Sequence, residues 1–120
     1  MEPAKQPVLI YREGKWSKMS STDLVPGDIV LLASGDRVPA DLRLLQARNL
    51  RIDEAALTGE SVPVDKDTAE VDEAAPIGDR LGMAYAATMV TQGQARAAVV
   101  ATGARTEIGR IGRLLEEVQA

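Results

Sequence analysis

The apolar residues of this chain are grouped in short segments, and glycine or proline stands at most of the boundaries between them. The clearest segment is 28–34, "DIVLLAS", which follows Pro26-Gly27. Proline presets φ and glycine accepts a positive φ, so this dipeptide suits the centre of a type II turn. An uninterrupted apolar run of this length predicts a strand that is buried on both faces. The other segments of strand length are 8–12, 15–19, 42–47, 50–57, 81–90 and 93–103.

The connections between these segments contain residues that turn the chain. Glu13-Gly14 predicts a hairpin between the first two segments. Arg48-Asn49 and residues 91–93 are expected to join the later segments in pairs. Residues 61–79 are acidic and contain proline without clear periodicity, which predicts a long surface excursion. Residues 1–7 are polar with two prolines and are expected to form a disordered N-terminal arm.

The end of the chain differs in kind, because residues 108–118 repeat apolar side chains at helical spacing. Thr106 is a suitable N-cap, and Glu107 is favoured in the first turn. Gly109 and Gly112 each cost a helix about 1 kcal/mol relative to alanine, so close packing must hold this amphipathic helix. Short strands with Pro/Gly turns and one terminal helix predict a mainly β fold: a sandwich, a barrel or a jelly roll.

The composition excludes several classes of function. The 120 residues contain no cysteine and no histidine, which removes disulfides, thiolate sites, Ser-His-Asp catalysis and most zinc sites. The net charge of −4 and the scattered basic residues argue against nucleic acid as a partner. No segment has the length of a membrane span, and residues 1–7 lack the apolar core of a signal peptide. The core must be aliphatic, since the only aromatic residues are Tyr11, Trp16 and Tyr85.

The candidate functional segment is 52–66, "IDEAALTGESVPVDK". The turn Thr58-Gly59 is expected to carry Glu60 at an exposed tip, where a carboxylate can orient water or accept a proton from it. Gly59 lets the backbone approach another surface closely, and Thr58 and Ser61 can fix the loop through bonds to the backbone. Such a loop would be half of an active site, and we expect the other half elsewhere, because we find no substrate-binding pattern in this chain.

Other chemical patterns are weaker. The chain has neither GxxxxGK[ST] nor GxGxxG, so we expect no nucleotide site and no metal site within it. The acidic residues Asp65, Asp67, Asp72 and Glu73 lack EF-hand spacing and are expected to be a solvated loop. Residues 65–68, "DKDT", are likewise expected to be loop. Asp53 and Glu54 are expected to brace the candidate loop or to face solvent.

Three stretches together resemble one family. "DEAALTGESVPVDK" is similar to the signature of the actuator domain of P-type cation-transporting ATPases. "LVPGDIVLLASGDRVPADLRLL" and "GMAYAATMVTQGQARAAVVATGARTEIGRI" resemble the segments before and after that signature. The resemblance covers roughly residues 8–115, in the family's order, and is most like the calcium and sodium/potassium-type branch. It implies a distorted jelly roll or double-stranded β-roll.

The resemblance also implies a function. In these pumps a separate domain carries an aspartyl phosphate, and the TGES loop of the rotating actuator domain docks over it. Glu60 would position and activate the hydrolytic water, with Thr58, Gly59 and Ser61 shaping the loop. The rotation would couple dephosphorylation to ion gating, and Mg²⁺ and ATP would be bound elsewhere in the pump.

The expected domain, 8–120, would therefore be one cytoplasmic part of an integral membrane pump. Its partners would be the phosphorylation and nucleotide-binding domains and the transmembrane helices of the same polypeptide. The chain lacks the family's DKTGT motif and membrane spans, so alone we expect an inactive monomer. The alternative is an independent β-roll module whose acidic loop binds a protein. A stand-alone glycosidase is disfavoured, because it needs two acids facing a cleft.

Overall fold

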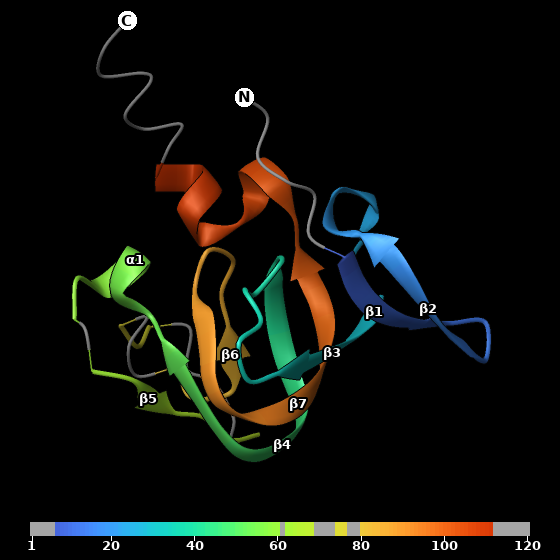
Figure 1. The fold of residues 1–120 in the computed structure, drawn as a ribbon. Helices are drawn as coiled ribbons and strands as arrows, with labels where there is room; N and C mark the ends of the chain where they lie inside the picture. Colours follow the sequence, from blue (N-terminus) through green and yellow to red (C-terminus); the bar gives the residue numbers. More distant parts are fainter. Residues whose placement is uncertain (1–6, 61, 69–73, 77–79, 112–120) are drawn as a thin grey trace, which may run out of the picture.

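The computed structural model describes residues 7–60, 62–68, 74–76 and 80–111. These residues form one antiparallel sheet of seven strands in the order β2-β1-β3-β7-β4-β5, with β6 paired to β4. Figure 1 shows the sheet curling around its own interior, with the β1–β2 hairpin on one side and α1 on the other. The mainly β, roll-like fold predicted from the sequence is confirmed.

The strands are β1 (Pro7–Arg12), β2 (Lys15–Ser20), β3 (Ile29–Ala33), β4 (Asp41–Asp53), β5 (Val64–Asp65), β6 (Met83–Ala84) and β7 (Met89–Ala101). The short helical turns are η1 (Ser21–Asp23), α1 (Ala55–Thr58) and η3 (Gly103–Arg105).

The hairpin and the first turn form as the sequence predicts. Tyr11 pairs with Trp16 across β1 and β2, around a turn at Glu13-Gly14 where both residues have positive φ. The Pro26-Gly27 turn is closed by a bond from the Asp28 N–H to the Val25 carbonyl, and Gly27 has a φ of +98°. That combination is the geometry of a type II turn.

Two of the predicted joints are bends within strands rather than turns between them. β4 runs without a break through Arg48-Asn49, and β7 runs without a break through residues 91–93. The two irregular places lie against each other, because the β4–β7 register shifts between Arg48 and Arg51 and Arg48 pairs with Gln94. A bend in one long strand needs a matching bend in its neighbour. Arg48-Asn49 and residues 91–93, which the sequence analysis read as joints, mark that shared bend. The expected strand at 81–90 is interrupted: Met83–Ala84 form the short strand β6, and residues 89–90 begin β7.

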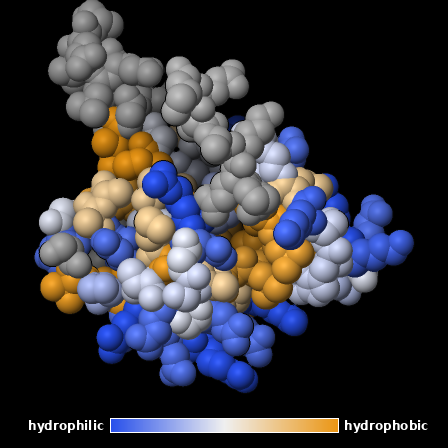
Figure 2. All heavy atoms as spheres, in the orientation of Figure 1, coloured by the Kyte–Doolittle hydropathy of each residue, from blue (hydrophilic) through white to orange (hydrophobic). Residues whose placement is uncertain are grey.

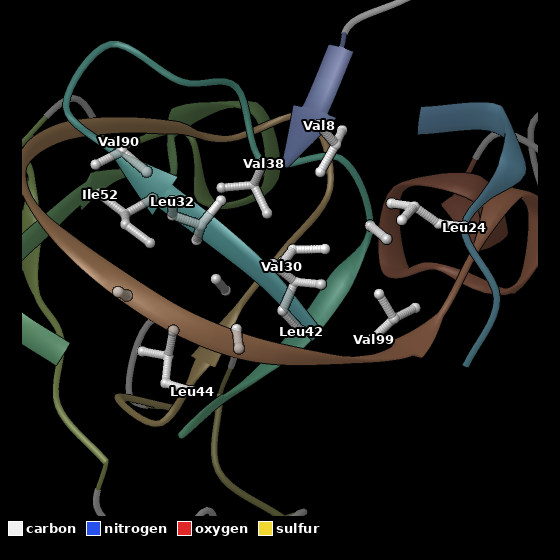
Figure 3. Packing of buried hydrophobic residues seen from close by; sticks show 14 of the residues in the cluster. Val8, Leu24, Val30, Leu32, Val38, Leu42, Leu44, Ile52, Val90 and Val99 are labelled. Carbon is white, nitrogen blue, oxygen red and sulfur yellow. The ribbon is translucent and has the colours of Figure 1, made fainter. Parts of the chain in front are cut away.

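The prediction that "DIVLLAS" is buried on both faces is wrong. In β3, Val30 and Leu32 are buried while Ile29 and Leu31 are only half-buried. One face of the sheet packs on the interior and the other remains partly open, as antiparallel sheets allow. Figure 3 shows Val30, Val38, Leu42 and Val99 among the aliphatic side chains that fill the interior. Figure 2 shows other apolar residues on the surface, between hydrophilic ones.

Two aspartates of the turn motifs bind backbone amides. Asp28 accepts from the Val25 N–H and pairs with the Arg12 guanidinium, whose hydrogen bond lowers the pKa of Asp28. Asp41 lies at the start of β4 and accepts from the N–H groups of Ala86 and Glu107. Burial raises the pKa of Asp41, although those two N–H groups oppose the shift. Asp41 thus ties the first turn of the C-terminal helix to the sheet.

The chain ends fall partly outside the described residues. Of the expected N-terminal arm, only Pro7 is described, and it belongs to β1. The predicted C-terminal helix begins as expected, since residues 107–111 are helical and the Thr106 hydroxyl accepts from the Gly109 N–H. Its remainder, 112–120, lies outside the described residues. In the part of the chain that is described, no helix is long and apolar enough to cross a membrane.

The shared bend of β4 and β7 predicts that Gly93→Ala destabilises the fold severely. Gly93 has a φ of +84°, and a Cβ there would lie 2.3 Å from the Asn49 carbonyl oxygen. Left-handed strain and a backbone clash together should cost at least about 3 kcal/mol. Gly35→Ala is the matched control, because Gly35 has a φ of +92° but open space around it. It should cost about 1–2 kcal/mol. Urea unfolding of both variants measures the difference, and equal losses would contradict the packing argument.

Candidate functional site

The candidate loop begins at the end of the long central strand β4. The single helical turn α1 follows at once and ends at Gly59, which has a left-handed φ of +76°. The Gly59 N–H donates to the Ala55 carbonyl, which closes the turn as an αL helix cap does. A Cβ built at Gly59 would meet nothing within 4 Å. Glycine is therefore favoured here by its backbone conformation, and it leaves the tip of the loop bare.

Thr58 connects the two sides of this tip. Its hydroxyl donates to the Glu54 carbonyl at 3.2 Å and accepts from the Glu60 N–H at 3.2 Å. The Glu54 carbonyl also accepts from the Thr58 N–H at 3.0 Å. These bonds fix the direction in which the chain leaves α1, and so fix where Glu60 is carried.

Glu60 lies exposed at the tip. Among the described residues, its carboxylate forms no hydrogen bond and no ion pair. Ser61, the fourth residue of the motif, lies outside the described residues. The geometry therefore shows a fixed backbone that presents an unpaired carboxylate to solvent, which can accept a proton from water or from a docked surface.

A buried ion pair lies beneath the loop, and the sequence analysis missed it. Lys66 Nζ lies 2.7 Å from Glu54 Oε2, and both side chains are fully buried. The contact is an ion pair rather than a well-aligned hydrogen bond, since both carboxylate oxygens of Glu54 remain without one in the described residues. Lys66 also donates to the Arg80 carbonyl at 3.2 Å. Burial raises the pKa of Glu54, and the Lys66 ammonium opposes the rise.

This pair decides between the two expectations for Glu54, which does not face solvent. Lys66 lies outside the strands, as expected for residues 65–68 after Asp65, but its side chain is buried. The burial of Glu54 could have been inferred from the alternation, because Glu54 continues the buried positions Leu50 and Ile52 of β4. The pair joins the chain before the loop to the chain after it.

Further contacts stabilise the two chain segments that flank the loop, before and after it. Arg51 and Ile52 of β4 pair with Asp65 and Val64 of β5, and Arg51 Nε lies 2.6 Å from Asp65 Oδ1 on the exposed side. Asp53 Oδ1 accepts from the Ala55 N–H at 2.9 Å. Asp53 and Glu54 thus brace the loop, as one of the two expectations stated.

The acidic residues after the loop show no metal site in the part of the chain that is described. No group of three or more carboxylates gathers among those residues. Asp65 forms an ion pair with Arg51. Asp72 and Glu73 lie outside the described residues.

Comparison with known proteins identifies the family of this domain. The family model for the P-type ATPase actuator domain matches residues 2–116. This chain belongs to that family. A probable cation-transporting ATPase F of Mycobacterium tuberculosis is 54% identical over 88% of the chain, which spans 12% of that protein. Calcium-transporting ATPase 1 of Bacillus cereus is 45% identical over 91% of the chain and 13% of its own length. A sodium/potassium exporting P-type ATPase of Schizosaccharomyces pombe is 48% identical over 90% of the chain and 11% of its own length.

Solved structures agree with the fold of this actuator domain. A zinc-transporting PIB-type ATPase in the E2P state matches with a TM-score of 0.76 and 28% identity over 99% of this chain. The match covers 18% of that pump. The actuator domain described here is therefore similar to a small part of much longer membrane-pump proteins.

The buried pair predicts a strongly non-additive response to mutation. Lys66→Met leaves the Glu54 carboxylate buried without its partner, which should cost about 3–5 kcal/mol of unfolding free energy. The double variant Glu54→Leu/Lys66→Met removes both charges and should recover most of that loss. The exposed pair is the control, because Arg51→Met should cost less than about 1 kcal/mol. Urea unfolding at pH 7 measures all three.

The pH dependence of the unfolding free energy provides a second test with the same variant, Lys66→Met. The folded-state pKa of Glu54 is raised, so ionised Glu54 disfavours folding and its protonated form does not. Without Lys66 the opposing charge is gone, and the deficit of Lys66→Met should shrink as the pH is lowered from 7 toward that raised pKa. A deficit that does not change with pH would show that Glu54 is not the source of the cost.

Proposed function

We propose that this actuator domain supplies the water-activating carboxylate for hydrolysis of an aspartyl phosphate formed elsewhere in a P-type cation pump. The observation that carries the proposal is Glu60, an exposed and unpaired carboxylate at the tip of a braced loop. Membership of the actuator-domain family supports it.

The chemistry needs one proton acceptor beside an in-line water. As the water oxygen bonds to phosphorus, Glu60 takes its proton. The bond between phosphorus and the aspartyl oxygen breaks, and its electron pair leaves with the aspartate carboxylate. A positioned acid–base group of this kind contributes about 10²–10⁴-fold to a rate. The products are inorganic phosphate and the unmodified aspartate side chain of the pump. Glu60 then returns the proton to solvent.

The rest of the loop serves close approach. Gly59 carries no side chain and has open space around it, so its backbone can come near a phosphate held by another domain. Thr58 holds the tip through its hydroxyl, and we assign Ser61 a loop-shaping role as well. Delivery on a separate domain lets the pump delay hydrolysis until the ion step is complete.

The remaining parts of the enzyme belong, on this proposal, to the longer polypeptide. Its phosphorylation and nucleotide-binding domains hold ATP and Mg²⁺, and rotation of the actuator domain couples dephosphorylation to gating by the transmembrane helices. This domain lies on the cytoplasmic side and, by itself, is a monomer that hydrolyses no ATP.

The proposal predicts that Glu60→Gln in the parent pump traps the phosphoenzyme. The phosphorylated intermediate should still form, and its decay after an unlabelled ATP chase should slow by about 10²–10⁴-fold, because the water loses its proton acceptor. Asp65→Asn is the matched control, as it neutralises another exposed carboxylate beside the loop. It should leave the decay near the wild-type rate. Wild-type decay in Glu60→Gln would exclude the proposed role.

A further inference from the structure

The outward face of the sheet at the hairpin end carries exposed apolar and basic side chains and is not covered by the described residues. Strand register places Trp16, Tyr11 and Ile29 in one row across β2, β1 and β3. Leu31 and Arg96 share the next row with Gln46. Tyr11, Trp16 and Leu45 are 41%, 37% and 53% exposed, whereas the third aromatic residue, Tyr85, is buried. Two of the three aromatic residues of the chain therefore lie on this face.

The side chains form hollows rather than a smooth surface. Tyr11 and Trp16 pack with ring centroids 5.0 Å apart, and the Arg96 guanidinium lies 5.5 Å from the Trp16 ring centre. An open hollow of about 600 Å³ is bounded by these three residues with Ile29, Leu45 and Gln46. A second hollow of about 490 Å³ lies on the other side of Arg96, beside Leu31 and Arg48. Packed aromatic and arginine side chains around hollows are typical of the centres of protein interfaces.

The charge of this face is opposite to that of the chain. The chain carries a net charge of −4, yet this face has Lys18 and Arg96 in the row of Leu31, Arg48 in the following row and no carboxylate at these positions. None of the three has a carboxylate partner in the described part of the chain. Asp36 lines the adjoining hollow near Lys18, but it already accepts from the Ala33 N–H. The face is thus suited to an acidic partner.

We propose that this face, the outward surface around Trp16, Leu45 and Arg96, docks an acidic segment bearing apolar side chains from the same polypeptide, outside residues 1–120. Acidic groups would meet Lys18, Arg48 and Arg96, and apolar side chains would enter the two hollows. The source in the same polypeptide rests on the proposed function. The chain spans 12% of the Mycobacterium relative and 13% of the Bacillus cereus relative that it matches. A tethered segment has a high effective concentration, so a face of this modest size is sufficient.

Two other occupants fit less well. An anionic membrane is typically recognised by about 4–8 clustered basic residues, and this face has three. The Trp16 ring is also held between Tyr11 and Arg96 and is not free to insert. A second copy of the chain would place the same three basic residues opposite one another, which is repulsive. Figure 1 shows the β1–β2 hairpin on the side opposite α1, so docking here leaves the Glu60 loop accessible.

The test uses the full-length parent polypeptide in its native membrane, with a photo-crosslinking benzophenone side chain in place of Leu45. Crosslinked peptides are identified by mass spectrometry. We expect an intramolecular crosslink to a segment rich in Asp and Glu with neighbouring apolar residues. The pair Lys18→Glu/Arg48→Glu should lower its yield at least about fivefold, because two attractions become repulsions.

Matched controls separate this proposal from the proposed function. Lys15→Glu/Arg105→Glu makes the same change of charge at exposed residues away from the face and should leave the crosslink intact. Glu60→Gln should leave it intact as well, since the readout needs no turnover. Tryptophan emission of the 120-residue chain, which has Trp16 as its sole tryptophan, confirms that each variant folds.

Several outcomes would overturn the proposal. These are crosslinks to lipid, to a separate protein or to a second copy, crosslinks to a segment without acidic residues, and a yield unchanged by Lys18→Glu/Arg48→Glu. An intact docking crosslink together with wild-type phosphoenzyme decay in Glu60→Gln would instead reject the proposed function and leave the docking surface standing.

Discussion

The pairing of β4 with β7 is the interaction on which the rest of the structure depends. Each strand has 13 residues, and together they form the centre of the sheet. Both bend at the same place, where the backbone of Arg48 and Asn49 lies so close to Gly93 that no side chain fits. Beyond the bend, β4 continues to Asp53 and delivers the chain into α1 and the loop. The position of Glu60 therefore follows from the register of two strands that take no part in chemistry.

Below the loop, burial and charge act against each other. Glu54 and Lys66 lie where the strand alternation places apolar residues, and taking both charges out of water is costly. A buried ion pair of this kind adds little stability compared with apolar residues of the same size, but removing one partner is expensive. The pair consequently favours one arrangement of the two loop flanks over others. The exposed Arg51–Asp65 pair links the same strands from the solvent side, with far weaker consequences.

Much of the fold could be predicted from local signals, and the failures have physical causes. The hairpin at Glu13-Gly14 and the Pro26-Gly27 turn depend on backbone preferences within four residues, so the sequence specifies them directly. Asn49 and Gly93 were predicted to join separate strands, and that prediction is wrong because β4 and β7 continue through them. Only the pairing of β4 with β7 decides that they bend a strand instead of ending it. The half-open face of β3 likewise depends on which strands pack on it, which a continuous apolar run does not reveal.

In the candidate site too, some features could be predicted from the sequence and others depend on contacts made only in the folded chain. Thr58, Gly59 and Glu60 were recognised from their motif, and the structure adds that Glu60 is exposed on a turn closed by bonds within the chain. The Glu54–Lys66 contact joins residues on either side of the loop, and the acidic surroundings of Lys66 made it resemble a solvated residue. The outward face at Trp16 and Arg96 could not be predicted from the sequence for a related reason. Its residues come from β1, β2, β3, β4 and β7, which become neighbours only in the folded sheet.

Oxygen exchange between inorganic phosphate and water tests most directly whether Glu60 activates the water. The exchange runs the hydrolysis backwards and forwards, so it reports the step in which water and phosphoryl group combine. If Glu60 is the proton acceptor, ¹⁸O-labelled phosphate incubated with the Glu60→Gln parent pump should lose its label at least about 100-fold more slowly than with the wild type. Exchange at the wild-type rate would contradict the account, because water would then attack without the carboxylate that this loop presents.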